Sequence, residues 1–196
     1  MLEYIRASLD EAEQALGQLI RNTATQQKIS EAALVLVSCF KARGHVYSCG
    51  NGGSMCDAMH FAEELSGRYR QNRSALGAIA MGDGAHITCT ANDFGYDSIF
   101  SRFIEAQGRS GDVLLAISTS GSSANVIKAA AAAQQIGMKV IVLTGKTESA
   151  LARYADVEIC TPGGRFADRV QELHIKVIHI LIELVERHLF VENYPA

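Results

Sequence analysis

The sequence lacks the features that mark several large classes of protein. Only two prolines occur, Pro162 and Pro195, and neither marks a domain boundary. The cysteines are odd in number, widely scattered and form no CxxC pair, so neither a disulfide framework nor a zinc knuckle is indicated. We expect reduced and mostly buried thiols at all of them, namely Cys39, Cys49, Cys56, Cys89 and Cys160.

An excess of charge and a long apolar run are also missing. Lys and Arg number 18 against 21 Asp and Glu, and no block of like charges occurs, so a nucleic-acid partner is not expected. No stretch reaches about 18 uninterrupted apolar residues, and acids stand near the N-terminus where a signal peptide would be apolar. These absences predict a cytoplasmic protein that does not contact the membrane.

What is present is an ordinary globular composition, with 48% hydrophobic and 20% charged residues. A chain of 196 residues buries roughly 70% of the surface that it exposes when unfolded, so it can fold without disulfides or metal. We find no internal repeat and no low-complexity segment. A single domain over residues 1–196 is therefore expected.

Apolar periodicity predicts helices at the ends of the chain and a sheet between them. Residues 1–43 show helical spacing over 2–20 and a second, more continuously apolar helix over 30–40. Residues 44–166 alternate strand-length apolar runs with helix-length segments, which predicts an α/β sandwich of three layers with a parallel sheet in the middle. The five expected strands are 45–49, 76–81, 113–117, 140–143 and 157–160.

The last helix, within residues 167–190, has apolar side chains around most of its circumference. Such a helix needs partners on several sides. We expect it to pack against the N-terminal helices and against another subunit.

Two loops rich in small residues each follow a predicted strand and precede a predicted helix. Glycines in CGNGGS (49–54) let backbone amides approach an oxyanion at a helix N-terminus. Hydroxyls and amides in STSGSS (118–123) can bind a phosphate without lysine. A tight turn and a serine cap are the alternatives. Because both loops would lie at the carboxyl ends of parallel strands, a phosphorylated ligand is favoured.

Two pairs of side chains have helical spacing that suits acid/base or metal chemistry. His60 and Glu64 are four residues apart, and Gln171 and His179 are eight apart in the last helix. Such donors suit a zinc-like ion or a proton-transfer pair, although a core histidine and a surface pair remain alternatives. We expect the two pairs to meet at a subunit boundary.

The other polar candidates are weaker. Asn92-Asp93 signals a turn by default, with contact to a substrate hydroxyl as the sharper alternative. His174 points away from His179. Three further histidines have no neighbouring acid/base or metal-binding candidate and are interpreted as structural: His45, His86 and His188.

Four segments resemble the phosphoheptose isomerase family, a branch of the sugar isomerase (SIS) domain superfamily: GNGGSMCDAMHFAEELSGRYR, NDFGYDSIFSR, GDVLLAISTSGSSANVIKA and ADRVQELHIKVIHILIELVE. The resemblance implies a five-stranded parallel sheet of flavodoxin-like order, with terminal helices that form the core of a homotetramer and active sites between subunits. It also implies conversion of sedoheptulose 7-phosphate to D-glycero-D-manno-heptose 7-phosphate, the first step toward the ADP-heptose of lipopolysaccharide core.

The resemblance assigns roles residue by residue. It implies one zinc ion per subunit, bound by His60, Glu64, Gln171 and His179. Glu64 and His179 would also be the acid/base pair that moves a proton through an enediol. The implied substrate contacts are Asn51, Gly52, Gly53, Glu64, Asn92, Asp93, Ser118, Thr119, Ser120, Ser123 and Gln171.

The chain departs from the family pattern in three places, and two other functions remain open. Ser122 stands where relatives commonly have Asn, and the loops 144–149 and 162–166 differ from the usual sequence. One alternative is a non-catalytic SIS-domain protein that associates with a replication initiator. The other is an isomerase of another sugar phosphate, because the loops explain phosphate binding but do not indicate the number of carbons in the sugar.

Overall fold

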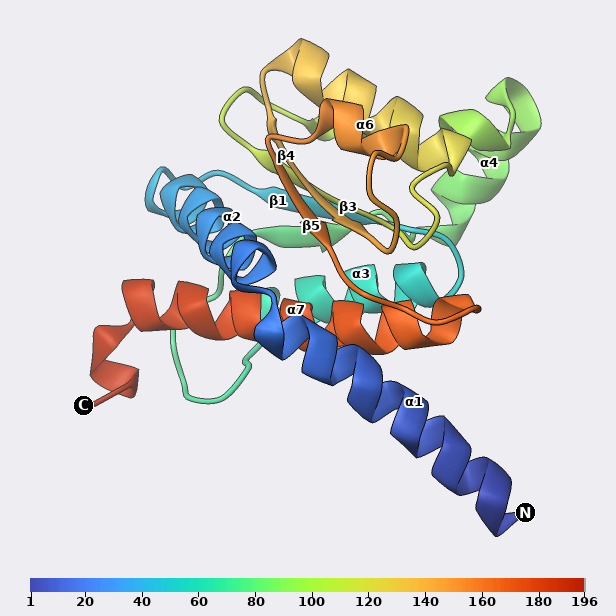
Figure 1. The fold of residues 1–196 in the computed structure, drawn as a ribbon. Coiled ribbons are helices and arrows are strands. Elements are labelled where there is room, and N and C mark those ends of the chain that lie inside the picture. Colours follow the sequence, from blue (N-terminus) through green and yellow to red (C-terminus); the bar gives the residue numbers. More distant parts are fainter. Residues whose placement is uncertain (196) are drawn as a thin grey trace.

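The computed structural model describes residues 1–195, which form three layers with a parallel sheet in the middle (Figure 1). The strand order is β2-β1-β3-β4-β5, the predicted flavodoxin-like order. The strands are β1 (Val46–Cys49), β2 (Ala78–Ala80), β3 (Val113–Ser118), β4 (Lys139–Thr144) and β5 (Val157–Cys160). The predicted α/β class is therefore confirmed.

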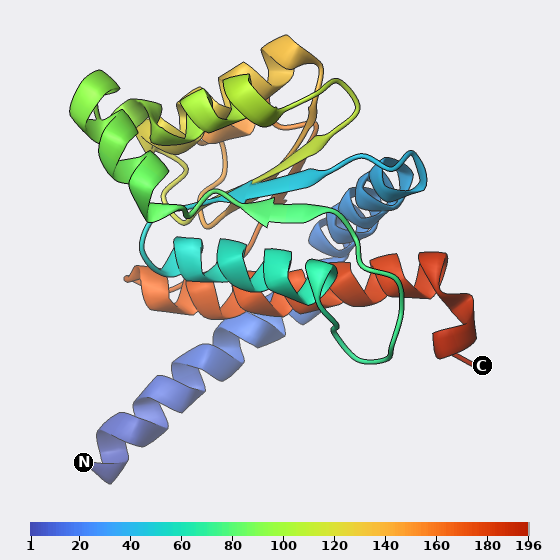
Figure 2. The ribbon, with the colours of Figure 1, turned by 180° about the vertical axis from the view of Figure 1, so that it is seen from behind.

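Helices cover both faces of this sheet, with α2, α3 and α7 on one face and α4, α5 and α6 on the other (Figures 1 and 2). The α-helices are α1 (Leu2–Arg21), α2 (Thr23–Lys41), α3 (Gly53–Ser66), α4 (Gly84–Phe94), α5 (Ile99–Gln107), α6 (Ala124–Ile136) and α7 (Ala167–Leu189). Short 3-10 helices are η1 (Tyr96–Ser98), η2 (Leu151–Tyr154) and η3 (Val191–Asn193).

The sheet separates two hydrophobic cores. Successive residues of a strand point to opposite faces, so Leu115 and Ile117 pack beneath α2, α3 and α7, whereas Leu114 and Ala116 pack beneath α5 and α6. Because both faces are buried, the central strands are apolar at nearly every position. That is why they could be predicted as short continuous runs.

The terminal helices pack together as expected. α7 contacts α1, α2 and α3, so its wide apolar surface is covered by the N-terminal helices and by α3. α1 extends away from the body of the molecule (Figure 1), and it buries only Ala15 and Leu19. Several other apolar side chains of this helix are exposed: Leu2, Ile5, Leu9, Leu16 and Ile20.

Two expectations are corrected by the structure. Only Cys39 and Cys49 are buried, while Cys56 and Cys89 are exposed because they lie off the buried stripes of α3 and α4. All cysteines of residues 1–195 are free thiols, as expected. Asn92-Asp93 is not a turn but belongs to the last turns of α4, because the chain reverses only afterwards, at Gly95 with φ +84°.

Within residues 1–195, no helix is both long and apolar enough to cross a membrane.

Candidate active site

The two small-residue loops lie side by side at the carboxyl edge of the sheet, because β1 and β3 are parallel neighbours. The first loop turns sharply into α3. Gly52 precedes the helix with φ +55°, a conformation that glycine adopts without strain, and the Ser54 amide donates to the Asn51 carbonyl at 3.1 Å. The amides that begin α3 therefore face the edge where a ligand of a parallel sheet binds.

The serine-rich loop is held in shape by its own hydroxyls. The Ser118 and Ser123 hydroxyls are 3.1 Å apart, and Ser118 Oγ accepts from the Gly121 amide at 3.2 Å. Gly121 has φ +61°, and a Cβ there would collide with Ser149. The Ser123 hydroxyl faces Ser118 rather than the amides of α6, which argues against a simple serine cap.

Ser122, the residue that departs from the family pattern, stabilises this loop. Its hydroxyl donates to Ser120 Oγ at 2.9 Å, and its amide donates to the same oxygen at 3.3 Å. Thr119 and Ser120 remain half-exposed and also line a cavity of about 240 Å³ with residues 163–167. The divergent loop 162–166 thus borders the serine-rich loop.

Sequence reasoning missed Asn125 and Tyr96, which connect the loops. Asn51 and Asn125 exchange two amide hydrogen bonds of 2.9 and 2.8 Å, and the Tyr96 hydroxyl donates to Asn51 Oδ1 at 3.0 Å. The available signal was their position: Asn125 follows the serine-rich loop directly, and Tyr96 follows the predicted contacts Asn92 and Asp93. Those two are exposed at the end of α4 and bond to each other at 2.8 Å.

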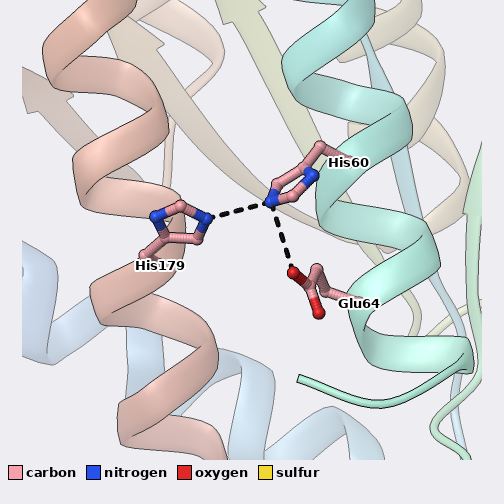
Figure 3. Close-up of side chains that lie close together, drawn as sticks. All are labelled: His60, Glu64 and His179. Carbon is pink, nitrogen blue, oxygen red and sulfur yellow. Dashed lines mark hydrogen bonds and ion pairs between the residues drawn. The ribbon is translucent and has the colours of Figure 1, made fainter. Parts of the chain in front are cut away.

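The catalytic candidates meet where α3 and α7 lie side by side (Figure 3), and the two helices run in the same direction (Figure 2). The Nε2 atoms of His60 and His179 are 2.9 Å apart, and His60 Nε2 lies 3.5 Å from a carboxylate oxygen of Glu64. One potential ligand atom from each lies within 4.8 Å of the others, so this group could hold a metal ion. These three side chains meet within one chain, on two adjacent helices.

Gln171 lies at the other end of the helix pair. A Cβ on Gly53 would approach both amide atoms of Gln171 to 2.7 Å, so this glycine makes room for the glutamine. The eight residues to His179 span about 12 Å of helix. The Gln171 amide thus lies beside the first turn of α3, and its metal role stays a prediction.

Burial alters the protonation of the site. It raises the pKa of Glu64, and Glu63 adds to this while His60 opposes it. The pKa of His179 is lowered, first by burial and then by His60 and Lys176. A neutral His179 can accept a proton or bind a metal through its free nitrogen. The donor set, two imidazoles and a carboxylate, is typical of zinc sites.

Two further titratable groups lie on the helices that carry the cluster, one half-buried and one fully buried. Asp57 lies one turn before His60, and burial raises its pKa to about 6. Sequence reasoning missed this carboxylate, which has no distinctive motif. His174 is fully buried and bonds the Thr144 carbonyl through Nε2 at 3.1 Å, and burial lowers its pKa to about 4. It points away from His179, as expected, and connects α7 to the end of β4.

Comparison with known proteins identifies the family. Residues 9–145 match the SIS domain model. A phosphoheptose isomerase of Salmonella typhimurium is 59% identical over 187 residues, which is 95% of this chain and 97% of that protein.

Two solved structures agree with this match. A phosphoheptose isomerase from Francisella tularensis has a TM-score of 0.89 at 34% identity, covering 95% of this chain and 98% of that chain. The enzyme from Neisseria gonorrhoeae has a TM-score of 0.87 at 38% identity, covering 94% and 98%. With the sheet order and the small-residue loops, these matches show that the chain belongs to the SIS domain family, in its phosphoheptose isomerase branch.

Proposed function

We propose that this protein is a ketose–aldose isomerase that converts sedoheptulose 7-phosphate to D-glycero-D-manno-heptose 7-phosphate, the first step of ADP-heptose synthesis for lipopolysaccharide core. The main observation is the cluster of His60, Glu64 and His179, which combines a carboxylate with two imidazoles on adjacent helices. The relatives named phosphoheptose isomerase support the heptose as substrate and favour an enzyme over a non-catalytic binding protein.

The serine-rich loop binds the phosphate. Its hydroxyls and the first amides of α6 supply neutral donors at the positive end of a helix dipole. Asn51, held by Asn125, orients the sugar together with the amides of Gly52 and Gly53. The remaining proposed contacts to the phosphate and the sugar are Ser118, Thr119, Ser120, Ser123, Asn92, Asp93 and Gln171.

Isomerisation moves a hydrogen from C1 to C2 while the carbonyl moves from C2 to C1. Glu64 removes the C1 proton, and its raised pKa makes the carboxylate a stronger base. Glu64 then returns that proton to C2, while the neutral His179 accepts the proton of the C1 hydroxyl and delivers it to the C2 oxygen, so that the carbonyl ends at C1. The reaction through the enediol therefore needs two groups, one for the carbon-bound proton and one for the oxygen-bound proton.

His60, Glu64 and His179 fit a zinc ion, with Gln171 as the proposed fourth ligand and one ion per subunit. When bound, such an ion polarises the carbonyl oxygen of the substrate. The facing Nε2 atoms of the two histidines support this proposal, because both are metal-ligating atoms and they lie 2.9 Å apart.

We further propose a cytoplasmic homotetramer. The exposed apolar residues of α1 form a stripe that is not covered within the described chain, which supports packing against other subunits. In such an assembly, a neighbouring subunit completes each active site.

The deciding experiment incubates the purified protein with sedoheptulose 7-phosphate, with and without chelator, and follows the aldose by NMR. We expect conversion that is lost with chelator and restored by Zn²⁺. An intact oligomer that converts nothing under any metal condition would favour the binding protein. Faster conversion of a pentulose or hexulose phosphate would favour the other isomerase.

A further inference from the structure

One buried ion pair near the cluster has no part in the chemistry proposed above. Arg73, in the loop between α3 and β2, donates from Nε to Oε1 of Glu186 on α7 at 2.8 Å. Both side chains are 0% exposed. Burying two charges is costly unless their hydrogen bonds are complete, and apolar replacement of such pairs is often neutral or stabilising. The pair therefore needs an explanation other than stability.

The other donors of Arg73 hold the end of α3. Its Nη2 donates to the backbone carbonyl of Glu64 at 2.6 Å, and its Nη1 donates to the carbonyls of Leu65 at 2.7 Å and Gly67 at 3.1 Å. Carbonyls in the last turn of a helix lack partners within the helix. The guanidinium thus caps α3 at the residue whose carboxylate belongs to the cluster.

The C-terminal segment completes this network. The Tyr194 hydroxyl donates to the second carboxylate oxygen of Glu186 at 2.6 Å, and the Asn193 side chain donates to the Asn72 carbonyl at 3.0 Å. Figure 2 shows the loop after α3 passing close to the end of α7 and the C-terminus. Glu186 therefore has a partner on each oxygen and is fixed in one orientation.

We infer that Arg73 and Glu186 are positioning residues that set Glu64 against His179. Arg73 holds the backbone of Glu64 itself, and Glu186 lies seven residues after His179 on the same helix. The ion pair is thus a direct link between one member of the cluster and the helix of the other. This inference rests on the proposed function, in which a small displacement of Glu64 slows proton transfer strongly.

The test replaces Arg73 by Met, which keeps an unbranched flexible side chain but removes the charge and the donors. We expect kcat for sedoheptulose 7-phosphate to fall about 100-fold, the scale of a misplacement near 1 Å, while KM stays within about twofold because the phosphate loop is untouched. The absorption spectrum of the Co²⁺-loaded protein should also change, because Glu64 and His179 are proposed ligands. Arg73→Lys should give an intermediate kcat.

The matched control is Arg102→Met, which removes an exposed arginine from the opposite face of the sheet, where it pairs with Glu105. It should leave kcat and the Co²⁺ spectrum unchanged. If Arg73→Met fails to fold, Tyr194→Phe decides, since it removes a single hydroxyl. We expect a threefold to tenfold lower kcat with unchanged KM and a shifted Co²⁺ spectrum.

A folded Arg73→Met or Tyr194→Phe protein with wild-type kcat and Co²⁺ spectrum, whatever its melting temperature, would overturn the inference. The proposed function fails differently: the wild-type protein itself then does not isomerise the sugar. In that case the Co²⁺ spectra of the wild type and Arg73→Met still decide whether Arg73 positions the cluster.

Discussion

The two halves of the site are built in different ways. The half that we propose to bind the phosphate is made of backbone amides and short hydroxyls on loops at the sheet edge, whereas the half that we propose to react is made of long side chains on two packed helices. A loop of redundant donors can lose one without losing its function. A cluster in which each side chain has its own role cannot lose one side chain without losing its function. We therefore expect changes in the loops to affect mainly KM and changes in the helices to affect mainly kcat.

The largest effect is expected for Glu64→Gln, which keeps the size of the side chain but removes the base. Loss of a general base costs 10²- to 10⁴-fold, so we expect kcat to fall about 10³-fold. Binding of the sugar phosphate, measured by calorimetry, should stay within about threefold. Glu105→Gln, an exposed carboxylate on α5 at the opposite face of the sheet, is the control and should retain nearly full activity.

The hydrogen bond of His174 that connects α7 to the end of β4 should be lost at low pH. His174 is buried as the neutral form with its pKa lowered to about 4, against about 6.5 when unfolded, so the unfolded chain takes up the proton first. The contribution is present above pH 6.5 and is lost as the pH falls toward 4, by up to about 3 kcal/mol. Urea unfolding at pH 7 and 4.5 measures most of this loss, and His174→Gln should lose about 2.5 kcal/mol less over the same interval.

A smaller effect on KM is expected for Gly121→Ala. The φ of +61° strains any other residue, and the added Cβ collides with Ser149, so the loop must move. We expect KM to rise about 30-fold, or about 2 kcal/mol, with kcat reduced less than threefold. Gly84→Ala, where a Cβ meets open space, is the control. A main effect of Gly121→Ala on kcat would contradict the division of the site.

The smallest effect is expected for Tyr96→Phe. The variant loses one exposed hydrogen bond to Asn51, which Asn125 still holds by two others. Such a bond contributes about 1 kcal/mol or less, so KM should rise no more than about threefold. Asn125→Ala, in which Asn51 loses its two hydrogen bonds with Asn125 and keeps the one from Tyr96, should raise KM further. Equal effects of the two variants would contradict this, because they would show that the tyrosine supports Asn51 as much as Asn125 does.

The fold was predictable from the sequence because its signals are local. The apolar runs of β3, β4 and β5 and the boundaries of α6 depend on burial patterns that can be read along the chain. The position of the short β2 could be predicted but its ends could not, since only Ala78–Ala80 pair with β1. Asn92-Asp93 was misjudged because turn-forming residues also end helices.

The site was predictable only where residues form a motif. The spacing of His60 and Glu64 places them on one helical face, but nothing in the sequence shows that α3 and α7 pack in the same direction. That packing brings His179 to His60 within one chain and places the Gln171 amide beside Gly53. Arg73 and Asn125 were missed because their roles depend on contacts with segments distant in sequence.

The central claim is that the loops bind the sugar phosphate while the helix cluster performs the proton transfer. One NMR measurement tests it directly: sedoheptulose 7-phosphate is incubated with excess Glu64→Gln protein beside the wild type. We predict that the wild type produces the aldose, whereas the variant broadens the phosphate signal by binding but forms no aldose on the same timescale. Aldose formation by Glu64→Gln at the wild-type rate would contradict the account.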